Sequence, residues 1–149
     1  MATAVADRLV LDTNVLIAAT DEARSDHDGA IAALDEWPAS GVELYTSGQI
    51  LREYLAVVTR PVRQNGLGLR QEAAVANVRA LRGRLRLMAE NEKVTDKLVE
   101  ILQAIACAGK QVHDATVVAT MLVHGIDTVV TANTDDFARF GRSVRAVAL

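Results

Sequence analysis

Short apolar runs alternate along the chain with longer stretches in which apolar residues recur every three or four positions. The runs are typical of strands buried on both faces of a parallel sheet, and the longer stretches are typical of helices. Strands are predicted at residues 9–11, 42–46, 85–88, 127–131 and 144–148, and helices at 15–20, 29–37, 47–58, 70–84, 95–108, 113–124 and 135–140. Because strands alternate with helices, the pattern predicts an α/β sandwich with a mainly parallel sheet.

Polar residues mark where two of these helices begin. Thr13 and Asn14 precede the helix at 15–20 and can cap its free N–H groups, and Asp12 is a further candidate for the same role. Residues 46–49, Thr-Ser-Gly-Gln, have the form of a capping box.

Composition narrows the protein class. The chain has 149 residues, so we expect one domain over residues 1–149. Half of the residues are hydrophobic but only 3% are aromatic, which predicts a core of Ala, Val, Leu and Ile. The net charge of −3 argues against a protein that coats nucleic acid non-specifically. With a single cysteine, no apolar run near the ~20 residues of a membrane span and no signal-peptide pattern, we expect a cytoplasmic protein without a membrane segment.

Four acidic segments carry the candidate chemistry. Asp12 directly follows the first strand, and Asp135 and Asp136 follow the strand at 127–131, where open α/β sheets bind ligands. Glu53 borders the apolar stripe of its helix, and Asp114 is expected at the start of an apolar helix. Each has a purely structural alternative: a helix cap for Asp12 and for one of the 135–136 pair, a solvated surface for Glu53, and the helix dipole for Asp114.

Carboxylates gathered in one crevice repel one another unless a cation compensates them. Oxygen ligands without a Cys or His cluster favour Mg²⁺ or Mn²⁺, which assist hydrolysis at phosphate. The residues alone therefore predict a metal-dependent phosphoesterase of unknown substrate. A haloacid dehalogenase-type phosphatase is disfavoured because Asn14 stands where its second Asp belongs. A phosphoacceptor signalling domain is disfavoured because no Lys follows Lys110.

The ordered motifs resemble those of the PIN domain. They are Asp12 in Leu-Asp-Thr-Asn-Val-Leu-Ile, Glu53 in the mid-chain helix, Asp114 in His-Asp-Ala, and Thr-Ala-Asn-Thr-Asp-Asp-Phe at 131–137. The match extends over nearly the whole chain, and the single-domain size further resembles the VapC toxins of bacterial toxin–antitoxin pairs.

The resemblance implies a three-layer α/β/α sandwich and a Mg²⁺- or Mn²⁺-dependent endoribonuclease that hydrolyses RNA with a metal-activated water. It also implies a homodimer and inhibition by a small cognate antitoxin. Two alternatives stay open: a PIN-like nuclease of RNA processing outside toxin–antitoxin systems, and a catalytically inactive PIN-like binding module.

Carried over by position, the resemblance makes Asp12, Asp114 and Asp136 the metal ligands. Glu53 completes the catalytic acids as a further ligand or a water-orienting base. Asn133 is neutral where many relatives have Asp, which leaves one or two bound metals open. The supporting residues are Thr13, Asn14, Thr131, Asn133 and Asp135, and the candidate RNA-binding residues are Arg52, Arg60 and Arg63.

Overall fold

The computed structural model describes residues 6–149, and its centre is a sheet of five parallel strands. The strands are β1 (Arg8–Leu11), β2 (Glu43–Ser47), β3 (Arg86–Met88), β4 (Thr128–Val130) and β5 (Arg145–Val147). They are arranged in the order β3-β2-β1-β4-β5. The predicted parallel sheet is confirmed.

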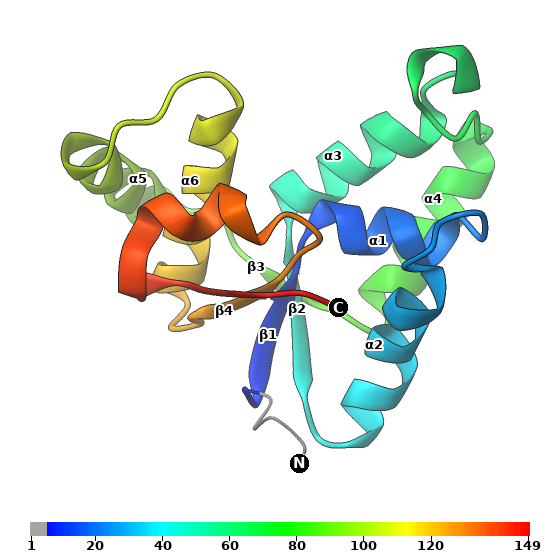
Figure 1. Ribbon diagram of the computed structural model, residues 1–149, viewed down its shortest axis with the longest axis horizontal. Coiled ribbons are helices and arrows are strands. Elements are labelled where there is room, and N and C mark those ends of the chain that lie inside the picture. The colour runs from blue at the N-terminus through cyan, green and yellow to red at the C-terminus, as the bar shows by residue number, and fades with distance from the viewer. Residues whose placement is uncertain (1–5) are drawn as a thin grey trace.

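Helices cover both faces of the sheet. They are α1 (Thr13–Thr20), α2 (His27–Ala39), α3 (Gly48–Thr59), η1 (Val62–Gln64), α4 (Gln71–Arg82), α5 (Glu92–Ala104), α6 (Lys110–Val123) and η2 (Thr134–Ser143). Figure 1 shows α1 to α4 on one side of the sheet and α5, α6 and the orange η2 segment on the other. The three-layer α/β/α sandwich is therefore confirmed. Within residues 6–149, no helix is long and apolar enough to cross a membrane.

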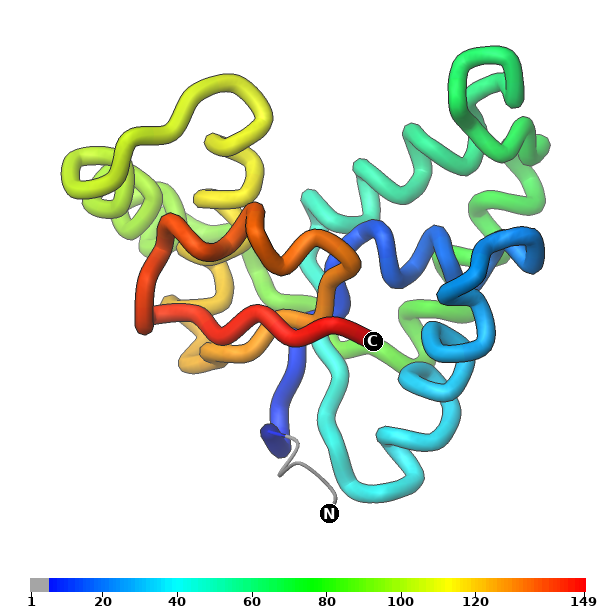
Figure 2. Tube along the Cα trace, in the orientation of Figure 1, coloured from blue at the N-terminus to red at the C-terminus, as the bar shows by residue number. Residues whose placement is uncertain are grey.

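The strand order places the candidate site. The chain runs from β1 to β2 to β3 in one direction and then crosses to β4 and β5 on the other side of β1, as the tube in Figure 2 also shows. Right-handed crossovers in opposite directions put the helices on opposite faces. A crevice therefore opens where β1 and β4 end side by side, with the Asp12 N–H donating to the Val130 carbonyl at 2.9 Å.

The core is built from small aliphatic side chains, as predicted. Val10 and Leu11 of β1 are fully buried, and the buried residues of α6 are Ala115, Val117, Val118, Ala119, Thr120 and Met121. Phe137 and Phe140 of η2 complete the core with rings 6.3 Å apart at a tilt of 53°. The site residues at the strand ends thus rest on a closely packed base.

Of the caps predicted for α1 the structure confirms the Asp12 alternative, and the capping box predicted for α3 needs correction. Asp12 itself, rather than Thr13 or Asn14, is the N-cap of α1, since its side chain accepts a hydrogen bond from the Thr13 N–H. The predicted capping box does not form at α3; Ser47 caps the helix on its own, with Oγ accepting from the Ile50 N–H at 3.3 Å. The hydroxyl of Thr46, one residue earlier in β2, is buried and has no hydrogen-bond partner among the described residues 6–149.

The predicted position of Asp114 at a helix start is also wrong. Helix α6 begins at Lys110, after Gly109 with φ of +56°, so Asp114 lies in the second turn. The helix dipole acts mainly within the first turn and does not account for this carboxylate. The turn η2 likewise begins without a side-chain cap, so neither Asp135 nor Asp136 has the predicted capping role.

Candidate active site

A cleft of about 690 Å³ opens at the carboxyl ends of the strands. It is lined from both helical layers, by α1 and α3 on one side and by α6 and the start of η2 on the other. The predicted residues that line it are Asp12, Thr13, Asn14, Arg52, Glu53, Arg60, Asp114, Asn133 and Asp136. The structure therefore brings all four predicted catalytic acids into one cleft.

Asp12 is held at the base of the cleft with both carboxylate oxygens hydrogen-bonded. Oδ1 accepts from the Thr13 N–H at 2.8 Å, and Oδ2 accepts from Thr131 Oγ1 at 2.8 Å and from Asn14 Nδ2 at 3.4 Å. Burial raises the pKa of the Asp12 carboxyl, and the charge of Glu53 adds to the rise, while the bonds from Thr131 and Thr13 oppose it. The carboxylate is thus oriented before any ligand arrives.

A side-chain network behind Asp12 fixes this orientation. Thr131 Oγ1 accepts from Asn14 Nδ2 and from the Asn133 N–H, both at 3.1 Å. Because these two bonds use its lone pairs, its single hydrogen is committed to Asp12. The Asn14 side-chain oxygen in turn accepts from the Ala132 N–H at 3.0 Å, which joins the ends of β1 and β4. The predicted supporting residues Asn14 and Thr131 therefore act on Asp12.

Glu53 is also held at both oxygens. Thr13 Oγ1 donates to Oε2 at 2.9 Å, and Gln49 Nε2 donates to Oε1 at 2.9 Å. Thr13 thus contacts Asp12 through its backbone and Glu53 through its side chain. These bonds set the relative position of the two acids.

The charges of the other three acids act on the pKa of the Asp114 carboxyl. Burial is the main reason why its pKa is raised, and the charges of Asp136, Asp12 and Glu53 raise it further, whereas Lys110 lowers it. Carboxylates that raise one another's pKa in a shared cleft are stabilised when a cation lies between them.

The donor set fits a hydrated hard cation. Within the described part of the chain, no group of three or more Asp, Glu, His or Cys side chains is arranged so that it could hold a metal ion directly. Mg²⁺ commonly binds through one or two carboxylates and keeps several waters, so loosely gathered carboxylates satisfy its requirements. The cleft acids therefore fit Mg²⁺ or Mn²⁺ held partly through water, and do not fit a closed structural site.

A family model for the PIN domain matches residues 9–143, which is most of the chain. The chain belongs to the PIN domain family. Two curated relatives agree with this assignment over nearly their whole length. Ribonuclease VapC24 of Mycobacterium tuberculosis is 31% identical over 144 residues, covering 91% of this chain and 92% of the relative. Ribonuclease VapC48 of the same organism is 30% identical over 131 residues, covering 87% and 89%.

Solved structures share the PIN fold at lower sequence identity. VapBC2 from Rickettsia felis, bound to a DNA fragment from its promoter, superposes with a TM-score of 0.69 at 17% identity and covers 95% of this chain and 98% of that chain. VapC20 from Mycobacterium tuberculosis, described as a sarcin–ricin loop cleaving toxin, gives 0.60 at 20% identity and covers 81% and 86%. At these identities the structures show the fold alone. Together with the named relatives, they confirm the predicted resemblance to VapC-type PIN domains.

Three predicted site residues of the PIN domain are not among the side chains that line the cleft. Asp135 is exposed, whereas its neighbour Asp136 lines the cleft. Arg63 is exposed on η1, three residues after Arg60. Thr131 lies behind the lining and reaches the site through its bond to Asp12.

Among the polar cleft residues that the sequence did not predict as site residues are Gln49 and Lys110. Each lies four positions before a predicted acid, Glu53 and Asp114 respectively, and residues four apart share a helix face. This spacing was a usable signal for Gln49. It was hidden for Lys110, because the helix was predicted to begin three residues after it.

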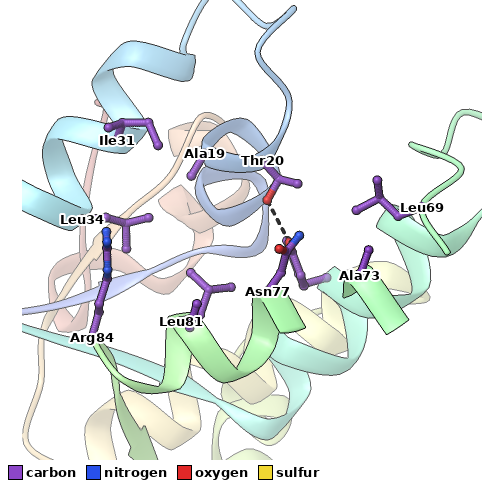
Figure 3. Close-up of a pocket in the computed structure, with 11 residues that line it drawn as sticks. Ala19, Thr20, Ile31, Leu34, Leu69, Ala73, Asn77, Leu81 and Arg84 are labelled. Atoms are coloured by element: carbon purple, nitrogen blue, oxygen red, sulfur yellow. Dashed lines mark hydrogen bonds between the residues drawn. The ribbon is translucent and has the colours of Figure 1, made fainter. Parts of the chain in front are cut away.

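A second cavity, of about 470 Å³, is lined mainly by apolar side chains of α1, α2 and α4 and carries none of the predicted acids. Figure 3 shows Leu34, Leu81 and Arg84 along it. The buried Tyr54 hydroxyl bonds Thr20 Oγ1 at 2.8 Å and accepts from Asn77 Nδ2 at 3.2 Å. This cavity is separate from the acidic cleft.

Proposed function

We propose that this PIN domain is a metal-dependent endoribonuclease and the toxin of a toxin–antitoxin pair. The observation that carries the proposal is the gathering of Asp12, Glu53, Asp114 and Asp136 in one cleft at the end of the central strands. The ribonuclease names of the two relatives support RNA as the substrate class. A non-catalytic module is disfavoured because all four predicted acids line the cleft.

In the proposed reaction, Asp12, Asp114 and Asp136 would hold Mg²⁺ or Mn²⁺, in part through intervening water molecules. When bound, the ion lowers the pKa of a water molecule and neutralises charge on the reacting phosphate. Glu53 orients the attacking water and accepts its proton, because hydrogen bonds to both of its oxygens hold it in one orientation. The supporting residues keep Asp12 aimed into the cleft.

Basic side chains at the rim of the cleft supply the phosphate contacts. Arg60 and Lys110 line opposite walls, and Arg52 lines the cleft while it pairs with Glu90 at 3.2 Å. Such contacts position the backbone of a nucleic acid without reading its bases. We also propose Arg63 as an RNA-binding residue, since it is exposed on η1 three residues after Arg60.

The remaining parts of the proposal concern assembly and place of action. We propose one domain over residues 1–149, of which the first five lie outside the described residues. We also propose a homodimer in the cytoplasm that a small cognate antitoxin inhibits. Solved VapBC complexes with the same fold support the antitoxin. Growth arrest on expression, relieved by co-expression of the small protein encoded next to it, would test the toxin assignment against a nuclease of RNA processing.

The ends of the RNA products test the reaction itself. Attack of water on phosphorus, with departure of the 3′-oxygen, leaves a 5′-phosphate and a 3′-hydroxyl. We expect these ends on every product, and we expect cleavage to stop in excess EDTA. Labelling of the 5′ ends and ligation of the 3′ ends identify the groups at the two ends of each product. The amount of product formed with and without EDTA measures the metal dependence. Cyclic phosphate ends, or full activity in EDTA, would contradict the proposed hydrolysis.

Lys110 gives a prediction about substrate binding. Replacing Lys110 by Met should raise the KM for RNA about tenfold or more, because a charged phosphate contact is lost. The plot of log affinity against log salt should also become less steep by about 0.7. Lys93→Met is the control, since Lys93 is exposed in the first turn of α5 and does not line the cleft. An equal effect of the two substitutions would indicate a general charge effect and no contact at Lys110.

A further inference from the structure

We propose that Gln49 is a positioning residue, which holds Glu53 in its working orientation by tying it to the backbone of α6. The inference rests on the proposed ribonuclease function, in which Glu53 orients the attacking water. Gln49 lies in the first turn of α3, one helical turn before Glu53, and only 8% of it is exposed. A buried side-chain amide requires hydrogen-bond partners, and the partners of Gln49 are both in the cleft wall.

The Gln49 amide nitrogen makes two hydrogen bonds. Nε2 donates to Glu53 Oε1 at 2.9 Å and to the backbone carbonyl of His113 at 3.0 Å. A primary amide has two N–H groups, so both are used. If the amide were rotated by 180°, its oxygen would face the Glu53 carboxylate and the His113 carbonyl, which are both acceptors, and neither hydrogen bond could form. Its two partners therefore determine which way the side chain lies.

These two bonds join the two sides of the molecule. Figure 1 shows α3 and α6 on opposite sides of the sheet, and residues of both helices line the cleft. The His113 carbonyl belongs to the peptide group that leads into Asp114, so Gln49 connects the Glu53 carboxylate to the backbone beside Asp114. Like charges on the two acids favour their separation, and the charge of Glu53 contributes to the raised pKa of Asp114. The Gln49 bonds oppose that separation.

The backbone of Gln49 is held in place by a hydrogen bond to Glu90. Its backbone N–H donates to Glu90 Oε1 at 2.6 Å, and the other Glu90 oxygen pairs with Arg52 at 3.2 Å. A carboxylate at this end of α3 is also favoured by the helix dipole. With Thr13 holding the second oxygen of Glu53, the carboxylate cannot turn freely about its terminal bond. Removing the Gln49 N–H donors would leave the Glu53 carboxylate with the Thr13 hydrogen bond alone, so its orientation would no longer be fixed at both oxygens.

The substitution Gln49→Met tests this role, because methionine has a similar length but no N–H donor. We expect kcat for RNA cleavage to fall about 10- to 100-fold, as for other residues that orient a catalytic group. KM should stay close to wild type, because Arg60 and Lys110 are untouched. In a Glu53→Gln background, measured under single-turnover conditions, Gln49→Met should cause a much smaller further loss. Asn77→Leu is the control: it removes a hydrogen bond in the other cavity and should lower Tm while leaving kcat unchanged.

A second measurement does not depend on catalysis. In the metal-free protein, NMR should show the two Gln49 side-chain amide protons exchanging slowly with solvent, and the Glu53 carboxyl carbon should shift in Gln49→Met but not in Asn77→Leu. Wild-type kcat in Gln49→Met, or an undiminished loss in the Glu53→Gln background, would overturn the inference. Rapid exchange of both protons would also overturn it. A wild-type protein that cuts no RNA would instead refute the proposed function, and the NMR result would still decide whether Gln49 holds Glu53.

Discussion

Replacing Asp12 by Asn is expected to abolish RNA cleavage, with a fall in kcat of at least about a thousandfold. Asp12 lies at the centre of the acidic cleft, and Asn keeps its shape but removes the charge that a divalent cation requires. The measurement is single-turnover cleavage with excess enzyme in Mg²⁺. Asp96→Asn is the matched control, because Asp96 is exposed on α5 and outside the cleft lining. Substantial activity in Asp12→Asn would refute the site assignment.

The surroundings of Asp12 add a structural cost to this substitution. One carboxylate oxygen faces the Thr13 N–H, and the other faces donors from Thr131 and Asn14. The NH₂ group of Asn must therefore meet a donor in either orientation, which offsets the benefit of removing a buried charge. We expect the variant to remain folded without becoming more stable. Circular dichroism and a melting curve should accompany the assay, with cleavage measured well below both transitions.

Metal binding is expected to stabilise the protein strongly. A ligand that binds only the folded state at a hundred times its Kd contributes about 2.7 kcal/mol. For a chain of this size, that corresponds to a rise in Tm of about 5–10 °C. Mn²⁺ should produce the rise at lower concentration than Mg²⁺, following the usual affinity order. Melting curves with each ion and with EDTA provide the measurement.

Asp114→Asn is the informative variant for this effect. Burial and the neighbouring acids raise the pKa of Asp114, so its ionised form is disfavoured in the folded protein. The neutral side chain should therefore raise Tm in EDTA and reduce the rise that metal produces. Asp96→Asn should leave both quantities near wild type. If metal raised Tm equally in wild type and Asp114→Asn, the ion would bind elsewhere than in the cleft.

Local sequence pattern was sufficient for the layers of the fold and for the four acidic segments. The apolar run before Asp12 predicts a buried strand, and the polar residues that follow it predict a strand end, because both features depend on neighbouring residues only. The helix boundaries were less well predicted. Helix α5 begins three residues earlier than expected because Asn91 caps it through the Val94 N–H at 3.2 Å. That cap was present in the sequence but was not recognised.

Only the tertiary structure decided between neighbouring candidates of the same chemistry. The Ser47 hydroxyl caps α3, whereas the Thr46 hydroxyl has no partner among the described residues, since successive strand residues point to opposite faces. Asp136 lines the cleft while Asp135 is exposed, since adjacent residues of a helical turn point in different directions.

Tertiary structure also decided which distant residues act together. Gln49 reaches the backbone of His113 across 64 positions of sequence, and Asn14 reaches Thr131 across 117. These partners meet because parallel strands bring their carboxyl ends to one edge of the sheet. Sequence pattern therefore determined which carboxylates were available. The strand order, which places β4 beside β1, determined which polar side chains hold these carboxylates in place.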